Sequence, residues 1–556
     1  MRLTETADVW WKNAVIYCLD IETFFDTDGD GRGDLRGVSQ RIDHLAELGV
    51  TCLWLMPFYP TPDRDDGYDI TDFYGVDRRV GTHGDLVELI TLAKDRGIRV
   101  IADLVVNHTS DQHPWFRSAR ASRESPYRGW YVWRDQPPPD ADKGIVFPGQ
   151  ETSLWQYDEA AGQYYLHRFR KFQPDLDIAN SEVREEIERV IGFWAELGLS
   201  GFRVDAVPFL LDTAGAEDAA NLPDPHDYLR ALRSFLDRRQ GQSMLLGEVN
   251  LPYPDVQRFY GENGDELTMC FDFIVMQRLY LSLARNDPAE LVKALQERPD
   301  PPGDGQWAMF VRNHDELTLD KLSDSERQEV FDAFGPDESM QLYGRGLRRR
   351  LPPMLGNDAD RIRMVYSLLF SLPGTPVLFY GEEIGMGENL AAPDRHAVRT
   401  PMQWTTDLNG GFSQADPNDL PAPMVEGEFG PENVNVAAQR RDRDSLFNWM
   451  KLLIRRYREC PELSWGTCTI LPTEARSVFA HRSDHDGGTI VAVHNFAAAD
   501  AHVTLAVAGA GIGVRAIDLF ADRTADVGED GTMAVDLPPY GCRWFRIVRP
   551  GDRYLV

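Results

Sequence analysis

Three carboxylic acids, far apart along the chain, lie at the ends of short apolar segments. Asp205 ends the segment GFRVD, Glu248 follows MLLG, and Asp315 ends RNHD. Burying a charge is costly unless it is paired or used, so three such residues favour a reactive site over three structural ion pairs. Two carboxylates beside a glycosidic bond suit sugar hydrolysis or transfer, because one attacks the anomeric carbon while the other, protonated, assists the leaving group.

Other polar residues accompany the three acids. Arg203 stands two residues before Asp205, so in a strand both side chains point to the same face, where the guanidinium favours the ionised carboxylate. A further apolar segment carries Asp103 and ends in Asn107 and His108. A third carboxylate near the reactive pair can hold substrate hydroxyls and raise the pKa of the acid by like charge.

Eight short apolar segments are candidates for the strands that would position these residues. Between the early ones, apolar residues recur at helical spacing, and these stretches stop at Gly49, Gly97 and Gly198, where a helix can close in the left-handed conformation. This alternation predicts an α/β fold, and eight parallel strands are the number in a TIM (β/α)8 barrel, whose strand ends form one active face. An open doubly wound sheet is the alternative. The candidate strands are residues 15–25, 51–56, 100–106, 201–207, 244–249, 269–273, 307–311 and 376–380.

Two parts of the chain fall outside this alternation. Residues 109–171 are rich in aromatic, proline and charged residues, and we expect a small insertion domain after the third strand, with most of its tryptophans in a local core. After residue 459, short turn-bounded runs predict a C-terminal all-β sandwich domain. The predicted domains are a catalytic barrel of residues 1–108 and 172–459, an insertion domain of residues 109–171, and a C-terminal domain of residues 460–556.

The overall charge limits the partners. The 556 residues carry a formal net charge of −31, which disfavours nucleic acid and anionic membranes. No run approaches the roughly 18 apolar residues of a membrane span, and the first residues do not resemble a signal peptide. Six cysteines without a C-x-x-C pair indicate free thiols, so we expect a cytoplasmic protein. The oligomeric state stays open, with a homo-oligomer among the alternatives.

An acidic segment early in the chain has the spacing of a calcium loop. Asp26, Asp28, Asp30 and Asp34 alternate with other residues, and Gly31 would allow the sharp turn. The glutamate that closes an EF-hand loop is absent, and a solvated acidic turn is the alternative. We expect a structural Ca²⁺ here that takes no part in the chemistry, and we expect no organic cofactor, because a carboxylate pair suffices.

Four segments, in their order and spacing, resemble the four sequence regions of the α-amylase superfamily. They are DLVVNH at 103–108, GFRVD at 201–205, GE at 247–248 and RNHD at 312–315. The run QPDLD at 173–177 is similar to an additional region of that superfamily, and the resemblance covers essentially the whole chain. It implies a retaining enzyme that acts on α-glucosides, with Asp205 as nucleophile, Glu248 as acid/base and Asp315 as transition-state stabiliser.

The same resemblance implies a pocket that binds a terminal glucose. His108, Arg203 and His314 would bind the sugar in the innermost subsite, Tyr68 would stack on it, and Asp65 would bond its hydroxyls. Arg399 would close the pocket. For Asp65, a turn residue is the alternative. The predicted substrate-binding residues are Asp65, Tyr68, His108, Phe172, Arg203, Phe209, His314, Glu316 and Arg399.

The resemblance also implies two calcium sites. In the first, the carbonyl of Arg32 joins the acidic loop, so that the predicted ligands are Asp26, Asp28, Asp30, Arg32 and Asp34. In the second, the predicted ligands are Asn107, Asp175 and Asp212.

Within the superfamily the chain is most similar to trehalose synthases, which transfer a glucosyl unit of maltose. The similar stretches are PDRDDGYD at 62–69, NHTSDQHPWF at 107–116 and VRTPMQW at 398–404. The chain departs from that group at several places. A tyrosine is replaced by Phe209, a glutamate by Asp320, and an Asn-Gln-Trp run by Asn-Leu-Pro at 250–252, while Asp20 and Glu22 stand in place of His and Lys.

Three functions follow from these residues. The first is a trehalose-synthase-like transfer that interconverts maltose and trehalose through a covalent β-glucosyl-enzyme, with hydrolysis as a side reaction. Because Phe209 lacks a hydroxyl that could help to retain the freed glucose, an α-glucosidase that hydrolyses small α-glucosides such as maltose or sucrose is the alternative. A non-catalytic binding or subunit protein is disfavoured, since Asp205, Glu248 and Asp315 are all present.

Overall fold

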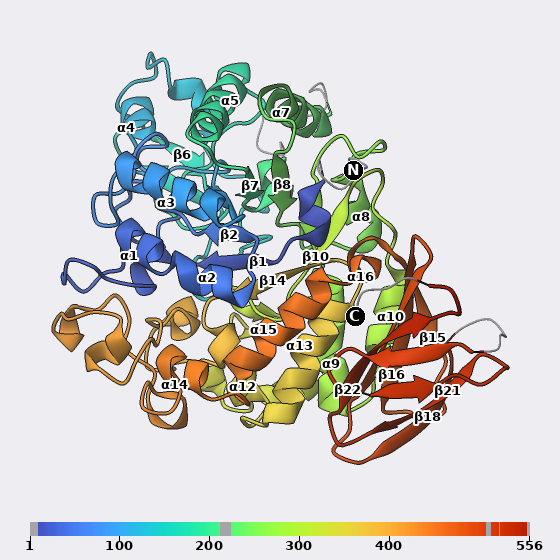
Figure 1. Cartoon of the computed structure of the whole chain (residues 1–556). Coiled ribbons are helices and arrows are strands. Elements are labelled where there is room, and N and C mark those ends of the chain that lie inside the picture. The colour runs from blue at the N-terminus through green and yellow to red at the C-terminus, as the bar shows by residue number, and fades with distance from the viewer. Residues whose placement is uncertain (1–8, 212–223, 508–512, 522, 553–556) are drawn as a thin grey trace.

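The eight predicted strands close into a barrel (Figure 1). The structure, a computed structural model, describes residues 9–211, 224–507, 513–521 and 523–552. Neighbouring strands are parallel, in the order β1-β14-β10-β9-β8-β7-β3-β2. The predicted TIM barrel is therefore confirmed, and the open sheet is excluded. The strands are β1 (Ile16–Leu19), β2 (Cys52–Leu55), β3 (Arg99–Leu104), β7 (Gly201–Val204), β8 (Met244–Gly247), β9 (Met269–Phe271), β10 (Gln306–Met309) and β14 (Thr375–Phe379).

Burial on both faces explains why these strands read as apolar runs rather than as alternating patterns. Every residue of β1, β2, β7 and β8 is buried. The register places Asp103 of β3 opposite Arg203 of β7, and Val204 of β7 opposite Gly247 of β8. Asp205 and Glu248 therefore leave the carboxyl ends of adjacent strands.

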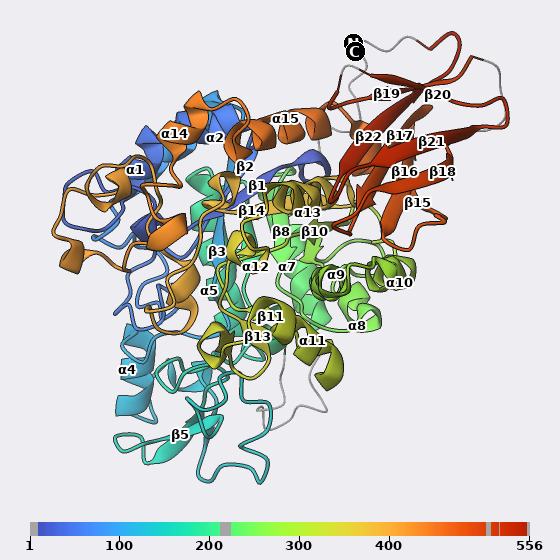
Figure 2. The ribbon, with the colours of Figure 1, turned by 90° about the horizontal axis from the view of Figure 1, so that it is seen from below.

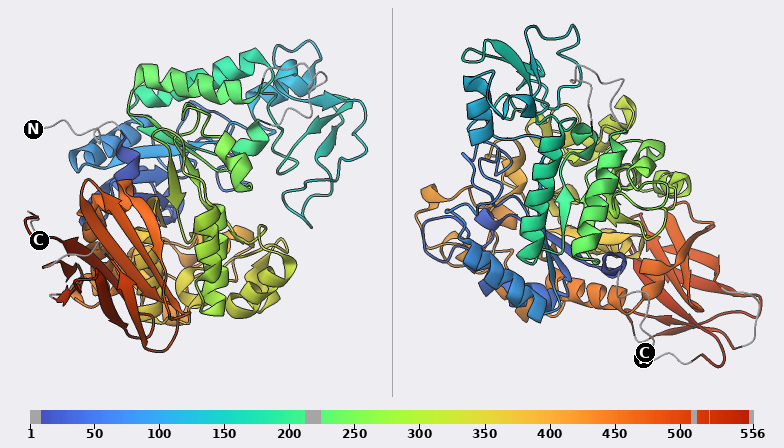
Figure 3. Two further views of the ribbon diagram at one scale, coloured as in Figure 1. Left: turned by 90° about the vertical axis from the view of Figure 1, so that its right-hand side faces the viewer. Right: turned by 90° about the horizontal axis from the view of Figure 1, so that it is seen from above.

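Helices surround the barrel and connect its strands (Figure 3). In α5, Val183, Ile187, Val190 and Trp194 form the buried face that the sequence predicted, and Asn180 caps the first turn. Among the described helices, none combines the length and the apolar character needed to cross a bilayer. The α-helices are α1 (Leu35–Gln40), α2 (Ile42–Leu48), α3 (His83–Asp95), α4 (Pro114–Ala121), α5 (Ser181–Glu196), α6 (Val207–Leu210), α7 (His226–Arg239), α8 (Tyr253–Arg258), α9 (Phe273–Arg285), α10 (Ala289–Glu297), α11 (Asp324–Phe334), α12 (Leu351–Met354), α13 (Ala359–Ser371), α14 (Val436–Arg441), α15 (Leu446–Arg458) and α16 (Pro461–Trp465).

The insertion after β3 contains α4 and a small antiparallel sheet with strand order β4-β6-β5. Its strands are β4 (Trp133–Arg134), β6 (Gln163–Leu166) and β5 (Trp155–Asp158). Trp155 packs with Leu154 and Leu166 in a local apolar cluster. Trp130 belongs to the main core, and Trp115 and Trp133 pack against it, so most of the insertion's tryptophans join the main core and not the local core that the sequence predicted. Figure 2 shows this insertion and the C-terminal domain on opposite sides of the barrel.

The C-terminal part is an antiparallel sandwich, as predicted. A six-stranded sheet, β15-β16-β17-β22-β19-β20, faces a two-stranded sheet, β18-β21, across its own apolar cluster. Trp544 of β22 donates its indole N–H to Ser367 Oγ of α13 at 3.0 Å and so docks the sandwich on the barrel. The domain boundaries at residues 108, 171 and 459 stay predictions. The strands are β15 (Thr467–Leu471), β16 (Val478–His485), β17 (Gly488–Asn495), β18 (Ala501–Ala506), β19 (Arg515–Asp518), β20 (Thr524–Asp526), β21 (Thr532–Leu537) and β22 (Cys542–Val548).

Candidate active site

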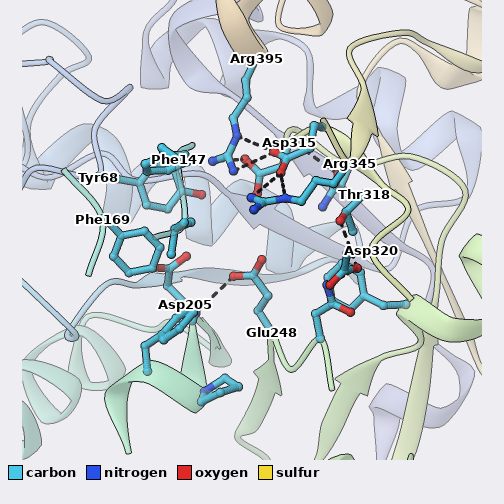
Figure 4. A pocket seen from close by; sticks show the side chains of 18 of the residues that line it. Tyr68, Phe147, Phe169, Asp205, Glu248, Asp315, Thr318, Asp320, Arg345 and Arg395 are labelled. Atoms are coloured by element: carbon cyan, nitrogen blue, oxygen red, sulfur yellow. Dashed lines mark hydrogen bonds and ion pairs between the residues drawn. The ribbon is translucent and has the colours of Figure 1, made fainter. Parts of the chain in front are cut away.

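A cavity of about 390 Å³ lies at the carboxyl ends of the barrel strands, and Asp205, Glu248 and Asp315 all line it. Figure 4 shows the three carboxyl groups turned toward the same space. Directly after Asp205 the chain turns at Ala206, which has a left-handed φ of 48°, and Ala206 N–H donates to Glu248 Oε2 at 3.2 Å. A strained non-glycine residue beside a reactive acid is a pattern typical of functional sites.

Arg203 forms ion pairs with both Asp205 and Glu248. Its Nη1 donates to Asp205 Oδ1 and its Nη2 to Glu248 Oε2, each at 2.7 Å, and Nη1 also contacts Asp103. Asp103 accepts a further bond from Trp54 Nε1 at 2.8 Å. The Arg203 side chain is 1% exposed, so its charge acts through a medium that screens poorly.

The two acids that flank the cavity differ in proton affinity. Burial raises the pKa of Asp205 to about 6, against the opposing effect of Arg203. Burial also raises the pKa of Glu248 to about 7, and the charges of Asp205 and Asp315 add to this while Arg203 opposes it. Near neutral pH the geometry therefore supplies an ionised Asp205 beside a partly protonated Glu248, the combination that retaining glycoside chemistry requires.

Asp315 is held as an anion by two guanidinium groups. Its Oδ1 lies 2.8 Å from Arg395 Nη1 and 3.0 Å from Arg399 Nη2, and its Oδ2 lies 3.5 Å from His314 Nε2. Burial alone would raise the pKa of Asp315, but Arg395, His314 and Arg399 together lower it well below its usual range. The carboxylate stays charged over the whole working range of pH.

One end of the cavity is closed by polar side chains that brace one another. Arg399 donates to His314 O at 2.7 Å and pairs with Asp66 on the far side of the cavity wall. Tyr68 OH lies 2.8 Å from His314 Nε2, and His108 Nε2 lies 3.0 Å from Tyr68 O. Burial lowers the pKa of His108 to about 4, so its ring is neutral near pH 7. Such a closed end suits a terminal sugar better than the middle of a polymer.

Polar groups also collect at the opposite, open end of the cavity. Asp320 Oδ1 accepts bonds from Asn250 Nδ2 at 3.0 Å and Gln277 Nε2 at 3.1 Å, and Asp320 Oδ2 lies 2.6 Å from Lys321 Nζ. Thr318 also lines this end. These fixed donors and acceptors can bind the hydroxyls of a second sugar ring. The sequence analysis predicted no residues for that second ring.

The family follows from the sequence match to known proteins. Residues 19–331 and 348–466 match the model described as alpha amylase, catalytic domain. This chain belongs to the α-amylase family. Residues 487–546 match a second model, described as sucrose hydrolase-like, C-terminal domain, and they fall in the C-terminal sandwich.

Individual relatives in the α-amylase family cover most of the chain. The trehalose synthase/amylase TreS of Mycolicibacterium smegmatis is 42% identical over 496 residues, which span 88% of this chain and 83% of that protein. The glucan 1,6-alpha-glucosidase of Streptococcus dysgalactiae subsp. equisimilis is 33% identical over 524 residues, which span 87% of this chain and 91% of that protein. The structure of trehalulose synthase MutB from Pseudomonas mesoacidophila MX-45 matches with a TM-score of 0.75 at 27% identity, covering 97% of this chain and 99% of that one.

The predicted aromatic contact at Phe172 has to be corrected. In this α-amylase-family enzyme the Phe172 ring lies under the guanidinium of Arg64, 4.3 Å from it, and does not line the cavity. Phe147 and Phe169 line the cavity instead. Phe169 belongs to the same aromatic and basic run as Phe172, but that run has no periodicity from which the inward-facing ring could be chosen.

The other predicted substrate-binding residues fall into two groups. Arg203 and His314 are not among the lining residues, but both contact residues that are: Arg203 donates to Asp205, and His314 Nε2 lies 2.8 Å from Tyr68 OH. Arg395 was missed altogether, although it lies four residues before Arg399. The predicted residues that do line the cavity are Asp65, Tyr68, His108, Phe209, Glu316 and Arg399.

The acidic loop partly matches its predicted role in this α-amylase-family chain. Asp26, Asp28 and Asp34 place ligand oxygens within 4.8 Å of one another, a donor set that suits a hard cation. Asp30 is outside this group, and its exposed carboxylate accepts the N–H of Arg32 at 2.8 Å. The guanidinium of Arg32 pairs with Glu22 and has no acceptor atom, so only the backbone carbonyl of Arg32 can be a metal ligand.

The second predicted calcium site lies only partly within the residues that the structure describes, and it stays a prediction. Asn107 Nδ2 lies 3.3 Å from Asp175 Oδ1 and donates to it, so two of the predicted ligands are neighbours. The third predicted ligand, Asp212, lies outside the described residues.

Proposed function

We propose that this chain interconverts maltose and trehalose by moving one glucosyl unit between two hydroxyls of the other glucose, with hydrolysis as a side reaction. The observation that carries this proposal is a single cavity that holds Asp205, Glu248 and Asp315, is closed at one end by Arg399, and is polar at the other. Such a cavity suits a disaccharide. The 42% identity to a trehalose synthase over 88% of the chain supports the choice of acceptor.

The reaction is a double displacement. In the first step an oxygen of Asp205 attacks the anomeric carbon, the glycosidic C–O bond breaks, and Glu248 gives its proton to the departing oxygen. In the second step the Glu248 carboxylate takes a proton from the anomeric hydroxyl of the retained glucose, whose oxygen displaces Asp205. The transferred glucose ends in the α configuration, and when water is the acceptor the products are two glucose molecules.

The surrounding charges assist these steps in defined ways. Ionised Asp315 stabilises the positive charge that develops at the sugar ring, and Arg203 keeps Asp205 available as an anion. Asp65 and Tyr68 line the closed end, where they would hold the transferred glucose. The fixed groups around Asp320 would hold the second glucose while it presents another hydroxyl.

The first experiment incubates the purified protein with maltose and follows all products by proton NMR. We expect trehalose to form faster than free glucose, and the reverse reaction to produce maltose from trehalose. Asp205→Asn should abolish both reactions with unchanged folding, since one carboxylate oxygen is lost as nucleophile. A fully active Asp205→Asn enzyme would contradict the assignment.

Hydrolysis of small α-glucosides is the second candidate, and Phe209 favours it. The Phe209 ring packs edge-on against Phe169, with centroids 5.6 Å apart and planes at 86°, and offers no hydroxyl to a freed glucose. A relative that is 33% identical is a glucan 1,6-alpha-glucosidase. Glucose as the sole product from maltose would select this candidate, and sucrose and isomaltose would be the next substrates to test.

We also propose that Asp26, Asp28 and Asp34 hold a structural Ca²⁺. Three carboxylates within reach of one ion support this site, and their mutual repulsion would be relieved by the cation. EDTA should lower the Tm, and Ca²⁺ should restore it. Asp28→Asn should abolish this response, whereas Asp30→Asn, in the same loop but outside the group, should keep it; equal responses of both variants would contradict the site.

We infer that the enzyme works in the cytoplasm, because all six cysteines are free thiols, which suits a reducing compartment. A homo-oligomer stays a prediction that light scattering of the purified chain tests.

A further inference from the structure

A loop of the insertion domain, residues 144–150, forms part of the wall of the cavity. Gly144, Ile145, Val146 and Phe147 line the cavity from this loop. Phe147 is only 1% exposed, although a loop residue would usually be solvated. Because this large apolar side chain is almost fully buried, the loop must pack against other parts of the chain at Phe147.

The ring of Phe147 packs against two arginine side chains and one tyrosine ring. The guanidinium of Arg170 lies 4.0 Å from the centre of the Phe147 ring, and that of Arg395 lies 5.1 Å from it. The ring of Tyr343 lies 5.3 Å away, and it too lies against Arg395, at 5.9 Å. Cations over aromatic faces attract, and more so when water is excluded. Phe147 therefore contacts the same guanidinium that forms the ion pairs of Arg395.

A second contact of the same loop reaches the neighbour of Arg395. Gln150 Nε2 donates to both carboxylate oxygens of Asp394, at 2.9 and 3.0 Å, and Gln150 Oε1 accepts from Arg170. Asp394 has a left-handed φ of 44°, a conformation that costs a non-glycine residue about 1 kcal/mol or more and persists only where its surroundings hold it. Gln150 provides such a hold from another domain.

Arg395 in turn touches the acids of the site. Its Nη1 lies 2.8 Å from Asp315 Oδ1, and its Nη2 and Nε each lie 2.8 Å from Glu316 Oε2. Arg345 neutralises the other oxygen of Glu316 at 3.0 Å. Figure 4 shows Arg395 reaching Asp315 at one side of the cavity, with Phe147 close to Arg395. The chain of contacts thus runs from the insertion loop through Arg395 to a carboxylate that faces the substrate.

We propose that Phe147 and Gln150 are positioning residues, which hold Arg395 on Asp315 and so fix the carboxylate that stabilises the transition state. We call these two residues the insertion clasp. The inference rests on the proposed glucosyl transfer. Without the clasp, Arg395 keeps Glu316 as a partner and can leave Asp315, so that Asp315 moves away from the place where positive charge develops. The insertion domain would then do more than line the pocket, because it would also position a catalytic carboxylate.

The kinetic test compares variants on p-nitrophenyl α-glucoside, whose first step needs no second sugar. Arg395→Gln should lower kcat on the order of 100-fold, as expected for the loss of a preorganised charge. Phe147→Ala should lower kcat by about 10-fold with KM nearly unchanged, because the lost effect is confined to the transition state. Phe147→Tyr should restore kcat to within about two-fold, since its ring keeps the cation contacts.

The double variant decides whether Phe147 acts through Arg395. If it does, Phe147→Ala combined with Arg395→Gln is no slower than Arg395→Gln alone, because the two changes remove one effect. Losses that multiply, or a rise in KM at constant kcat, would overturn the inference and make Phe147 a simple sugar contact. Tyr157→Ala is the matched control, an aromatic residue of the same domain that is 46% exposed and should leave kcat unchanged.

Hydrogen exchange tests the clasp without turnover. Peptides covering residues 390–402 should exchange faster in Phe147→Ala and in Gln150→Ala than in the wild type, and at the wild-type rate in Tyr157→Ala. Gln150 is exposed, so its replacement leaves the core intact. Unchanged exchange in both clasp variants would overturn the inference. A wild type that cleaves no α-glucoside would instead contradict the proposed function, so the two failures can be told apart.

Discussion

At the scale of single residues, Arg203 is the side chain on which the charges of the site depend. It pairs at once with Asp205 and Glu248, and it is almost fully buried. Its positive charge opposes the effect of burial on both acids, but it does not cancel that effect, because both pKa values remain above their usual range. The nucleophile and the acid/base can therefore hold different protonation states at the same pH.

This difference predicts a narrow pH optimum. As pH rises through about 6, Asp205 ionises and kcat/KM on p-nitrophenyl α-glucoside should increase; above about 7, Glu248 loses its proton and kcat/KM should fall. Glu248→Gln should remove the falling limb, since the amide does not titrate. A profile that is level from about pH 5 to about pH 8, or a falling limb that survives Glu248→Gln, would contradict these roles.

At the scale of elements, the approach of β7 to β8 sets the distance between the two acids. Gly201 begins β7 with φ 151°, and a Cβ there would lie 2.2 Å from Met244 O and 2.7 Å from Met244 N. Only glycine fits this approach, because the contact is with backbone that belongs to the barrel itself. A side chain at this position would push apart the strands that carry Asp205 and Glu248.

Gly201→Ala should therefore affect both stability and catalysis. We expect the free energy of unfolding to fall by about 1–3 kcal/mol, from strain and displaced backbone, and kcat to fall with it. Urea unfolding and kcat on the same preparation measure the two effects. Gly241→Ala, in the loop that precedes β8, is the control, because its Cβ would meet nothing closer than Asp237 O at 3.8 Å. Equal behaviour of the two variants would refute the argument.

The same elements explain what the sequence could reveal. Buried parallel strands appear as apolar runs, and a polar residue at the end of such a run is conspicuous, so Asp205, Glu248 and Asp315 could be found by position alone. Arg395 and Phe147 could not, because they lie in loops without periodicity. Arg395 belongs to a short 3-10 helix, Asp394–Val398, between β14 and α14, and only the folded chain brings it to Asp315.

At the scale of the whole molecule, two buried histidines join the C-terminal sandwich to the barrel. His481 Nε2 lies 3.2 Å from Ser371 Oγ, and His494 Nε2 lies 2.9 Å from Ser367 Oγ, with both serines on α13. Both histidines are fully buried. Burial lowers the pKa of His481 to about 4, and it lowers the pKa of His494 below the usual range as well.

These histidines predict that the fold weakens in mild acid. Below about pH 6.5 an unfolded histidine binds a proton that the buried one does not, so the stability that each histidine contributes is complete above that pH and is lost as pH falls. For His481 the loss is about 1.4 kcal/mol per pH unit and ends near pH 4. Calorimetry should give a lower Tm at pH 5.5 than at pH 7.5. His481→Gln should lower the Tm at pH 7.5 and yet reduce this difference, because one titrating group is gone. His502→Gln is the control: it should leave both the Tm at pH 7.5 and this difference unchanged, since the His502 side chain is 65% exposed. The same acid sensitivity in His481→Gln as in the wild type would place the effect elsewhere in the molecule.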